Sequence, residues 1–235
     1  TRTINLLIVI ILLCHNLKAQ STYDSGYIIT TKNDTINGYI LNDIDYKLAY
    51  KISFKNELSD STITEFTSNE LLSFGFSSGR VFDRMKVETN NQTSKDSLNV
   101  FAKKIIDGKI DLYVWRHKKI KSNDYFIINN DSKRKARLTK PKNESIELDG
   151  KTYSKKDHSY KNRIAYVERD ENLESKKSEK IKFSEKSISK NILSYNRNFQ
   201  EEYPINKYEE PYVYNYDILV GIPLNLGSDG LAFMV

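Results

Sequence analysis

The chain has 235 residues, of which 38% are hydrophobic and 29% charged, with only nine Gly and four Pro. This length suits one large or two small globular domains, and the composition excludes wholesale disorder, collagen and a helical membrane bundle. Lys and Arg number 37 against 31 Asp and Glu, a modest excess that indicates an anionic partner only weakly.

Residues 1–19 have the pattern of an export signal. Arg2 precedes an unbroken apolar run over residues 6–14, too short to span a bilayer, and Ala19 supplies the small residue of a cleavage site. A buried N-terminal element and a lipoprotein anchor at Cys14 are the alternatives, but Leu13 is large where such an anchor has a small residue. Cleavage would remove Cys14, the only cysteine, so the exported chain would have no disulfide.

Residues 20–158 are predicted to form an antiparallel β domain, as a sheet, a sandwich or a half-barrel. Apolar and polar side chains alternate over residues 50–55 and 72–76, as in strands with one solvated face. The residues at 32–34 suit a tight turn between two strand-like stretches, which predicts a hairpin. Turn signals recur roughly every 8–12 residues, which favours antiparallel strands over βαβ units.

Two Asp-Gly pairs mark further hairpins. Asp107-Gly108 predicts a type I′ turn, because both central residues of that turn need a positive φ. The resulting register pairs, on one mostly apolar face, Phe101 with Val114, Lys103 with Leu112 and Ile105 with Ile110. On the other face Lys104 is expected to meet Asp111 in a solvent-screened contact. Asp149-Gly150 would similarly place Ile146 opposite Tyr153 and Glu144 opposite Lys155.

Residues 159–202 are predicted to form a helical segment with a linker. Ser184 is a typical N-cap, Glu185 follows in the first turn, and Phe183 is placed to pack onto Ile188. One apolar face then continues at spacings typical of a helix over 185–199. Its members are Ile188, Ile192, Tyr195 and Phe199.

Residues 203–235 are expected to be the incomplete start of an outer-membrane β-barrel. Every even position from 212 to 226 is apolar, whereas the odd positions include Asn, Asp, Gly and Pro. Such alternation, with aromatic residues at one end, is typical of a barrel strand that faces lipid. The predicted lipid-facing residues are Tyr212, Tyr214, Tyr216, Ile218, Val220, Ile222 and Leu224. An edge strand of a soluble sheet is the alternative.

Residues 26–30, 33–40, 101–113 and 187–196 together carry a recognisable pattern. They resemble the N-terminal domain of certain Gram-negative outer-membrane β-barrel proteins, the PorT-like family, over roughly residues 20–200. The resemblance implies a cell-envelope protein whose β-rich module, with a structural or binding role, lies in the periplasm or at the surface ahead of the barrel. Its motifs are structural, so it carries over no catalytic residue.

Catalytic and metal chemistry find little support in the residues. His117 and His158 lie outside any metal-ligand spacing, and both are expected to be solvated. Without a cysteine after the predicted signal, thiol catalysis and cysteine zinc sites are excluded. We therefore expect no enzymatic activity, no cofactor and no metal. A self-contained periplasmic or secreted β-rich binding protein is the first alternative function, and an exported hydrolase the second.

The densest basic segment spans residues 133–142, with Tyr125 and Phe126 nearby as surfaces on which bases could stack. Its cations are Lys133, Arg134, Lys135, Arg137, Lys140 and Lys142. Because exported proteins rarely meet nucleic acid, no nucleic-acid partner is predicted, and a charged hairpin tip is the simpler interpretation. The expected partner is outer-membrane lipid, bound through the barrel. An anionic glycolipid is the functional alternative for the basic segment.

Overall fold

A computed structural model describes residues 22–91, 94–117, 123–142, 144–149, 151–155, 157–169, 180–203 and 205–207. The predicted export signal lies outside these residues, as do the segment 170–179 and the predicted barrel strand with its lipid-facing positions from Tyr212 to Leu224. No helix in the described part of the chain is both long and apolar enough to cross a membrane.

The described chain is mainly β, as predicted. Its strands are β1 (Tyr23–Thr30), β2 (Thr35–Leu41), β3 (Lys51–Lys55), β4 (Thr64–Thr67), β5 (Leu71–Phe76), β6 (Val81–Asn91), β7 (Ser94–Asp107), β8 (Ile110–Trp115), β9 (Asp124–Asn129), β10 (Lys135–Leu138), β11 (Glu144–Leu148), β12 (Lys151–Lys155) and β13 (Asn206–Lys207). The helices are α2 (Asp45–Leu48), α3 (Ser159–Glu168) and α4 (Glu185–Asn196), which η2 (Arg197–Phe199) extends by a 3₁₀ turn.

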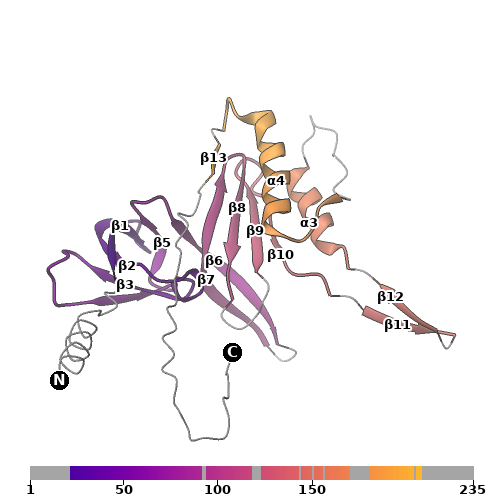
Figure 1. Cartoon of the computed structure of the whole chain (residues 1–235), viewed down its shortest axis with the longest axis horizontal. Coiled ribbons are helices and arrows are strands. Elements are labelled where there is room, and N and C mark those ends of the chain that lie inside the picture. The colour runs from indigo at the N-terminus through magenta and orange to yellow at the C-terminus, as the bar shows by residue number, and fades with distance from the viewer. Residues whose placement is uncertain are drawn as a thin grey trace, which may run out of the picture.

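One eleven-stranded antiparallel sheet runs through the molecule (Figure 1). Ten strands follow the order β10-β9-β8-β7-β6-β5-β1-β2-β3-β4, and β13 adds to β7. Strands β1–β5 curl at one end, whereas α3 and α4 cover β8–β10 at the other. The sheet therefore has two halves, joined through the long β6–β7 hairpin.

The curled half closes around its own aromatic core. The predicted hairpin at its start is confirmed: Asn33 has a φ of 66°, and Ile29 pairs with Thr35. The Phe74 ring stacks on Phe82 with centroids 4.7 Å apart and meets Phe101 edge-on at 5.0 Å. The core also contains Ile28, Ile40, Leu48, Ile52, Phe54, Leu71 and Phe76.

The other half buries one face of the sheet against the two helices. Ser184 caps α4 as predicted, because its hydroxyl accepts a hydrogen bond from the Ser187 N–H at 3.3 Å. Phe183 packs edge-on against Tyr125 and Tyr160. The core between sheet and helices includes Ile110, Leu112, Val114, Ile127, Ile164, Val167, Ile188 and Ile192.

The predicted register of the hairpin around Asp107-Gly108 is wrong. Lys103 pairs with Val114 and Lys104 with Tyr113, and a β-bulge interrupts β7 between Lys104 and Ile106. Neither Asp107 nor Gly108 is among the described residues with positive φ, so the turn is not type I′. Most of the predicted apolar face is confirmed, because Ile105, Ile110, Leu112 and Val114 share the core under the helices, whereas Phe101 packs in the core of the curled half. Phe101, Ile105, Ile110, Leu112 and Val114 are all buried.

Asn196 of α4 explains why this hairpin departs from the standard turn. Its side chain accepts a hydrogen bond from the Ile110 N–H and donates one to the Ile110 carbonyl, both at 2.9 Å. A Cβ at Gly108 would lie 2.5 Å from the Asn196 Nδ2. Glycine is therefore required here for a close approach and not for its backbone angles.

The second Asp-Gly hairpin forms as predicted. Ile146 pairs with Tyr153 and Glu144 with Lys155, and Asp149 has a φ of 53°. Its strands β11 and β12 make a two-stranded sheet of their own, which projects from the body (Figure 1). We call this projecting hairpin the arm.

Candidate functional site

Two clusters of charged side chains lie on opposite faces of β7. Lys103 and Lys104 are neighbours on this strand, so their side chains point to opposite sides of the sheet. Lys103 belongs to the junction cluster, formed with Asp45, Arg80, Arg116 and Glu185. Lys104 belongs to the tyrosine cluster, formed with Asp83, Asp107, Asp111 and Tyr113. The junction cluster lies on the face that the sequence predicted to be mainly apolar, whereas the tyrosine cluster lies on the face where it predicted the contact of Lys104 with Asp111.

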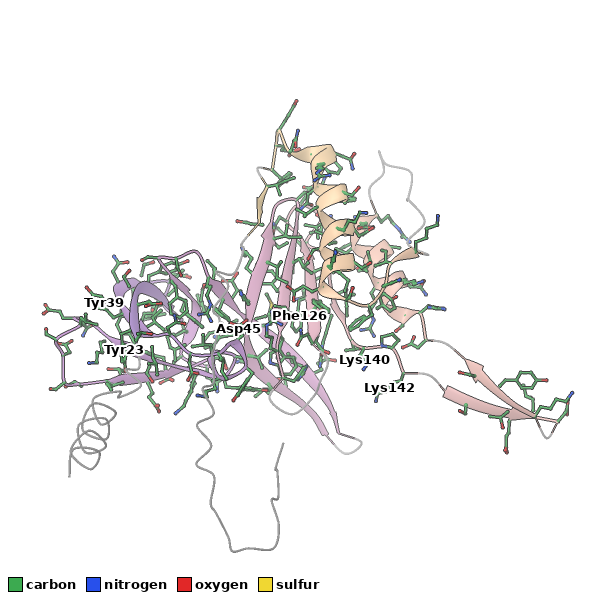
Figure 2. All side chains as sticks on the ribbon, viewed as in Figure 1. Tyr23, Tyr39, Asp45, Phe126, Lys140 and Lys142 are labelled. Atoms are coloured by element: carbon green, nitrogen blue, oxygen red, sulfur yellow. The ribbon has the colours of Figure 1, made fainter. Side chains whose placement is uncertain are left out.

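Asp45 is the centre of the junction cluster, and Figure 2 shows it where the curled strands meet β6–β8. One carboxylate oxygen lies 2.8 Å from the Arg80 Nη2. The other lies 2.9 Å from the Arg116 Nε and 3.6 Å from the Lys103 Nζ. The Lys103 side chain is only 4% exposed and that of Asp45 12%. Three cations thus surround one largely buried carboxylate.

The electrostatic balance keeps Asp45 ionised. Burial acts to raise the pKa of this carboxyl, but Lys103, Arg80 and Arg116 together outweigh it and hold the pKa below its usual value. Arg116 also lies 3.5 Å from Glu185 of α4. The cluster therefore links α2, the residue before β6, β7, the residue after β8 and α4. The junction cluster is thus a network of ion pairs that connects the two halves of the sheet.

One residue in the sequence indicated the junction cluster. Lys103 is the single charged residue on the predicted apolar face, and a lysine in such a place needs a buried partner. That partner, Asp45, lies on a four-residue helix that the alternating pattern did not predict.

The tyrosine cluster lies on the face that α3 and α4 leave uncovered. Lys104 Nζ is 3.7 Å from Asp83 and 3.6 Å from both Asp107 and Asp111. The predicted contact of Lys104 with Asp111 is therefore confirmed. It is not solvent-screened, however, since the two side chains are only 15% and 7% exposed.

A single hydroxyl proton is shared within this cluster. The Tyr113 hydroxyl lies 3.0 Å from an Asp83 oxygen and 3.2 Å from an Asp111 oxygen, yet it can donate to only one of them at a time. Burial raises the pKa of Asp111, although Lys104 and the Gly108 N–H act in the opposite direction. Burial and the two carboxylates also raise the pKa of Tyr113, so the phenol stays protonated. When Asp111 is protonated it can donate to Tyr113, which then donates to Asp83.

The prediction that His117 is solvated is wrong, whereas His158 is exposed as predicted. The His117 side chain is 11% exposed, and its Nε2 lies 3.6 Å from Asp124. Its ring centroid is 3.9 Å from that of Trp115. Arg137 pairs with the same Asp124 at 2.6 Å and lies over the Trp115 ring. The indole and the ion pair therefore remove His117 from solvent.

The basic segment is divided by the fold. Residues 130–134 form the turn between β9 and β10, which confirms the predicted hairpin tip, while Arg137 is held in its ion pair. Tyr125 and Phe126 are 4% and 7% exposed, so neither offers a stacking surface. Lys140 and Lys142 remain exposed on the chain that leads to the arm (Figure 2).

Glu168 at the end of α3 is a partly buried acid that belongs to neither cluster. It accepts a hydrogen bond from the Asn191 side chain of α4. Burial raises the pKa of Glu168 to about 7, although the hydrogen bond from Asn191 acts to lower it. The folded protein therefore binds this proton more tightly than the unfolded chain does.

Replacing Glu168 with glutamine should remove a pH dependence of stability. In the wild-type protein the free energy of unfolding should fall as the pH rises from about 4.5 to about 7, because over this range the unfolded chain loses the proton first. At pH 8 the E168Q variant should be more stable by about 2–3 kcal/mol. Urea unfolding at four pH values measures this, with the exposed Glu202→Gln as control. Parallel pH profiles for E168Q and the wild type would contradict it.

Within the described residues no group of three or more His, Cys, Asp or Glu side chains is arranged to hold a metal ion. In the tyrosine cluster the carboxylates surround the Lys104 ammonium group instead.

Comparison of the chain with protein-family models, with curated proteins and with solved structures found no match. A functional proposal for this chain therefore depends on its own residues and their arrangement.

Proposed function

We propose that this chain is a non-enzymatic exported module, with a structural or binding role, that precedes an outer-membrane β-barrel. The observation that carries the proposal is the alternation over residues 212–226, with eight apolar even positions and polar or small residues at five of the seven odd ones. Tyr212, Tyr214 and Tyr216 at one end of this segment suit the aromatic girdle of such a barrel. The export pattern of residues 1–19 supplies the step that outer-membrane insertion requires.

The position of β13 gives the proposal a structural consequence. Asn206 pairs with Asp107 and Lys207 with Ile106, so the chain is attached to the sheet immediately before the proposed barrel strand. Only residues 208–211 separate this attachment from Tyr212. The step from Lys207 to Tyr212 spans at most about 17 Å of extended chain. A barrel that began at Tyr212 would therefore hold the module close to the membrane surface.

The described module also has what an independent folded body needs. Its apolar side chains gather in three buried clusters, one inside the curled half, one under the helices and one on the helix-free face of β6–β9. Because these clusters are built from residues 28–195, we expect such a body to fold before the barrel strands insert.

Arginine variants on the two faces of the proposed strand test the function. In the full-length protein, Ile218→Arg would place a charge in hydrocarbon near mid-strand and should cost about 2–4 kcal/mol of insertion free energy. Asn215→Arg, which would face the barrel lumen, should be milder, as should Gly221→Arg where the lumen has room. The fraction of protein recovered in the outer membrane after carbonate extraction measures the effect.

The opposite result would overturn the proposal. If insertion survives Ile218→Arg but fails for Asn215→Arg and Gly221→Arg, the even face does not meet lipid. The chain would then be better described as a self-contained periplasmic or secreted binding protein.

A further inference from the structure

We propose that the arm, strands β11 and β12 with the approach at Lys140 and Lys142, docks on an anionic lipid surface. The inference rests on the proposed function, because export is what would bring the arm to an envelope membrane. It goes beyond that function, because it assigns a membrane contact to the described module itself, separate from the barrel strand.

The arm stands apart from the buried cores. Its strands pair with each other and form a sheet separate from the eleven-stranded one, and Figure 1 shows the hairpin projecting from the body. A two-stranded hairpin is marginally stable by itself in water. The body buries most of its large apolar side chains, yet the arm leaves Leu148 58% and Tyr153 53% exposed. An arm built in this way gains stability when a partner covers it.

The two faces of the arm differ in chemistry. Leu148 pairs with Lys151, and Tyr153 lies two residues further along the same strand, so the alternation of strand residues puts these three side chains on one face. The opposite face carries only polar residues, namely Ser145, Glu147, Thr152 and Ser154. One face thus exposes Leu148 and Tyr153 beside Lys151, and the other is suited to water.

The charges favour an anionic lipid surface as the partner. Residues 140–156 contain five Lys and three acids, a net charge of 5 − 3 = +2. Of the three acids, Glu147 lies on the polar face, Asp149 lies in the turn, and Glu144 begins β11 at the position paired with Lys155. Lys151 shares the face of Leu148 and Tyr153. Lys140 and Lys142 are exposed at the base of the arm (Figure 2). Tyr prefers the membrane interface, and Lys can rest its apolar stem there while its ammonium group meets a phosphate.

Fluorescence at a chosen position tests the contact. Tyr153→Trp and the matched control Tyr166→Trp replace two tyrosines of similar exposure, 53% on the arm and 50% on α3. The 235-residue chain is mixed with vesicles of phosphatidylethanolamine and phosphatidylglycerol that carry brominated acyl chains. Emission from the tryptophan at 153, after subtraction of the Trp115 signal, should shift to the blue and be quenched, whereas emission from 166 should change little.

Charge reversal tests the lysines. Lys142→Glu with Lys151→Glu should weaken binding to these vesicles by roughly tenfold or more, because each lysine near an anionic surface contributes about 1 kcal/mol. The same charge change made elsewhere, Lys32→Glu with Lys186→Glu, should have a smaller effect. Far-UV circular dichroism checks that both double variants are folded. Vesicles of phosphatidylcholine alone should bind weakly in every case.

Several outcomes would overturn the inference. Equal quenching at 153 and 166, no quenching at 153, or equal losses for the two double variants would each remove the arm from the lipid contact. Self-association that Leu148→Ser abolishes, in the absence of vesicle binding, would assign the arm to a second copy instead. These failures differ from failure of the barrel assignment, which Ile218→Arg decides without reference to the arm.

Discussion

Replacing Asp45 with alanine should destabilise the protein by about 3–5 kcal/mol, the range for removing one partner of a buried ion pair. The variant would leave Arg80, Lys103 and Arg116 close together without the carboxylate that they share. Among these three cations, Lys103 should lose the most free energy, because its side chain is 4% exposed and its ammonium group cannot be solvated by water instead. The free energy of unfolding in urea measures the loss.

Two further variants make this result specific. Asp43→Ala removes a nearby aspartate whose side chain is 25% exposed and pairs with Lys47, and it should cost only about 1 kcal/mol or less. Combining Asp45→Ala with Lys103→Met removes the buried lysine together with its partner and should recover part of the lost stability. If Asp45→Ala lowers the free energy of unfolding no more than Asp43→Ala does, the ion pairs of the junction cluster do not stabilise the fold in the way described above.

Replacing Phe101 with alanine should cost about 3–5 kcal/mol, because it removes a large side chain from a core that cannot collapse fully around the cavity. Phe101 is 1% exposed and meets Phe74 edge-on. Its backbone N–H donates to the Ala49 carbonyl at 2.8 Å, so the strand cannot easily shift to fill the space. Thermal and urea unfolding of the purified chain measure the change.

The control for Phe101 comes from the same strand. Leu98 on β7 is 41% exposed, and Leu98→Ala should change stability by only about 0.5 kcal/mol or less. Equal losses for the two variants would mean that the faces of β7 are assigned incorrectly. The structure rules out Lys104→Ala as a neutral control, because removing this lysine would leave Asp83, Asp107 and Asp111 without their shared cation.

Features that depend on neighbouring residues could be predicted from the sequence. Asp149-Gly150 gave the right register for the arm, and Ser184 gave the right start for α4, because turn and cap preferences arise within a few residues. The shared core of Ile105, Ile110, Leu112 and Val114 was also predicted correctly, because alternate residues of a strand point to the same face.

Features set by distant residues could not be predicted. The bulge after Lys104 and the turn at Gly108 depend on Asn196, which only the folded chain brings to Ile110. Asp45 and Lys103 are both visible in the sequence, but no local pattern pairs them. His117 is removed from solvent by Trp115 and Asp124, and neither contact has a spacing that marks a site.

The hydrogen bonds between Asn196 and Ile110 also bear on the order in which the chain can fold. A ribosome or an export channel releases the amino end first, yet the start of β8 receives its last two hydrogen bonds from a residue 86 positions later. Until Asn196 emerges, the backbone N–H and carbonyl of Ile110 lack these two hydrogen-bond partners, although Ile110 is fully buried in the final fold. Forming contacts across so long a stretch is slow, so the sheet and helices should acquire their final structure together. A nascent chain that has not yet released α4 would then be a substrate for chaperones.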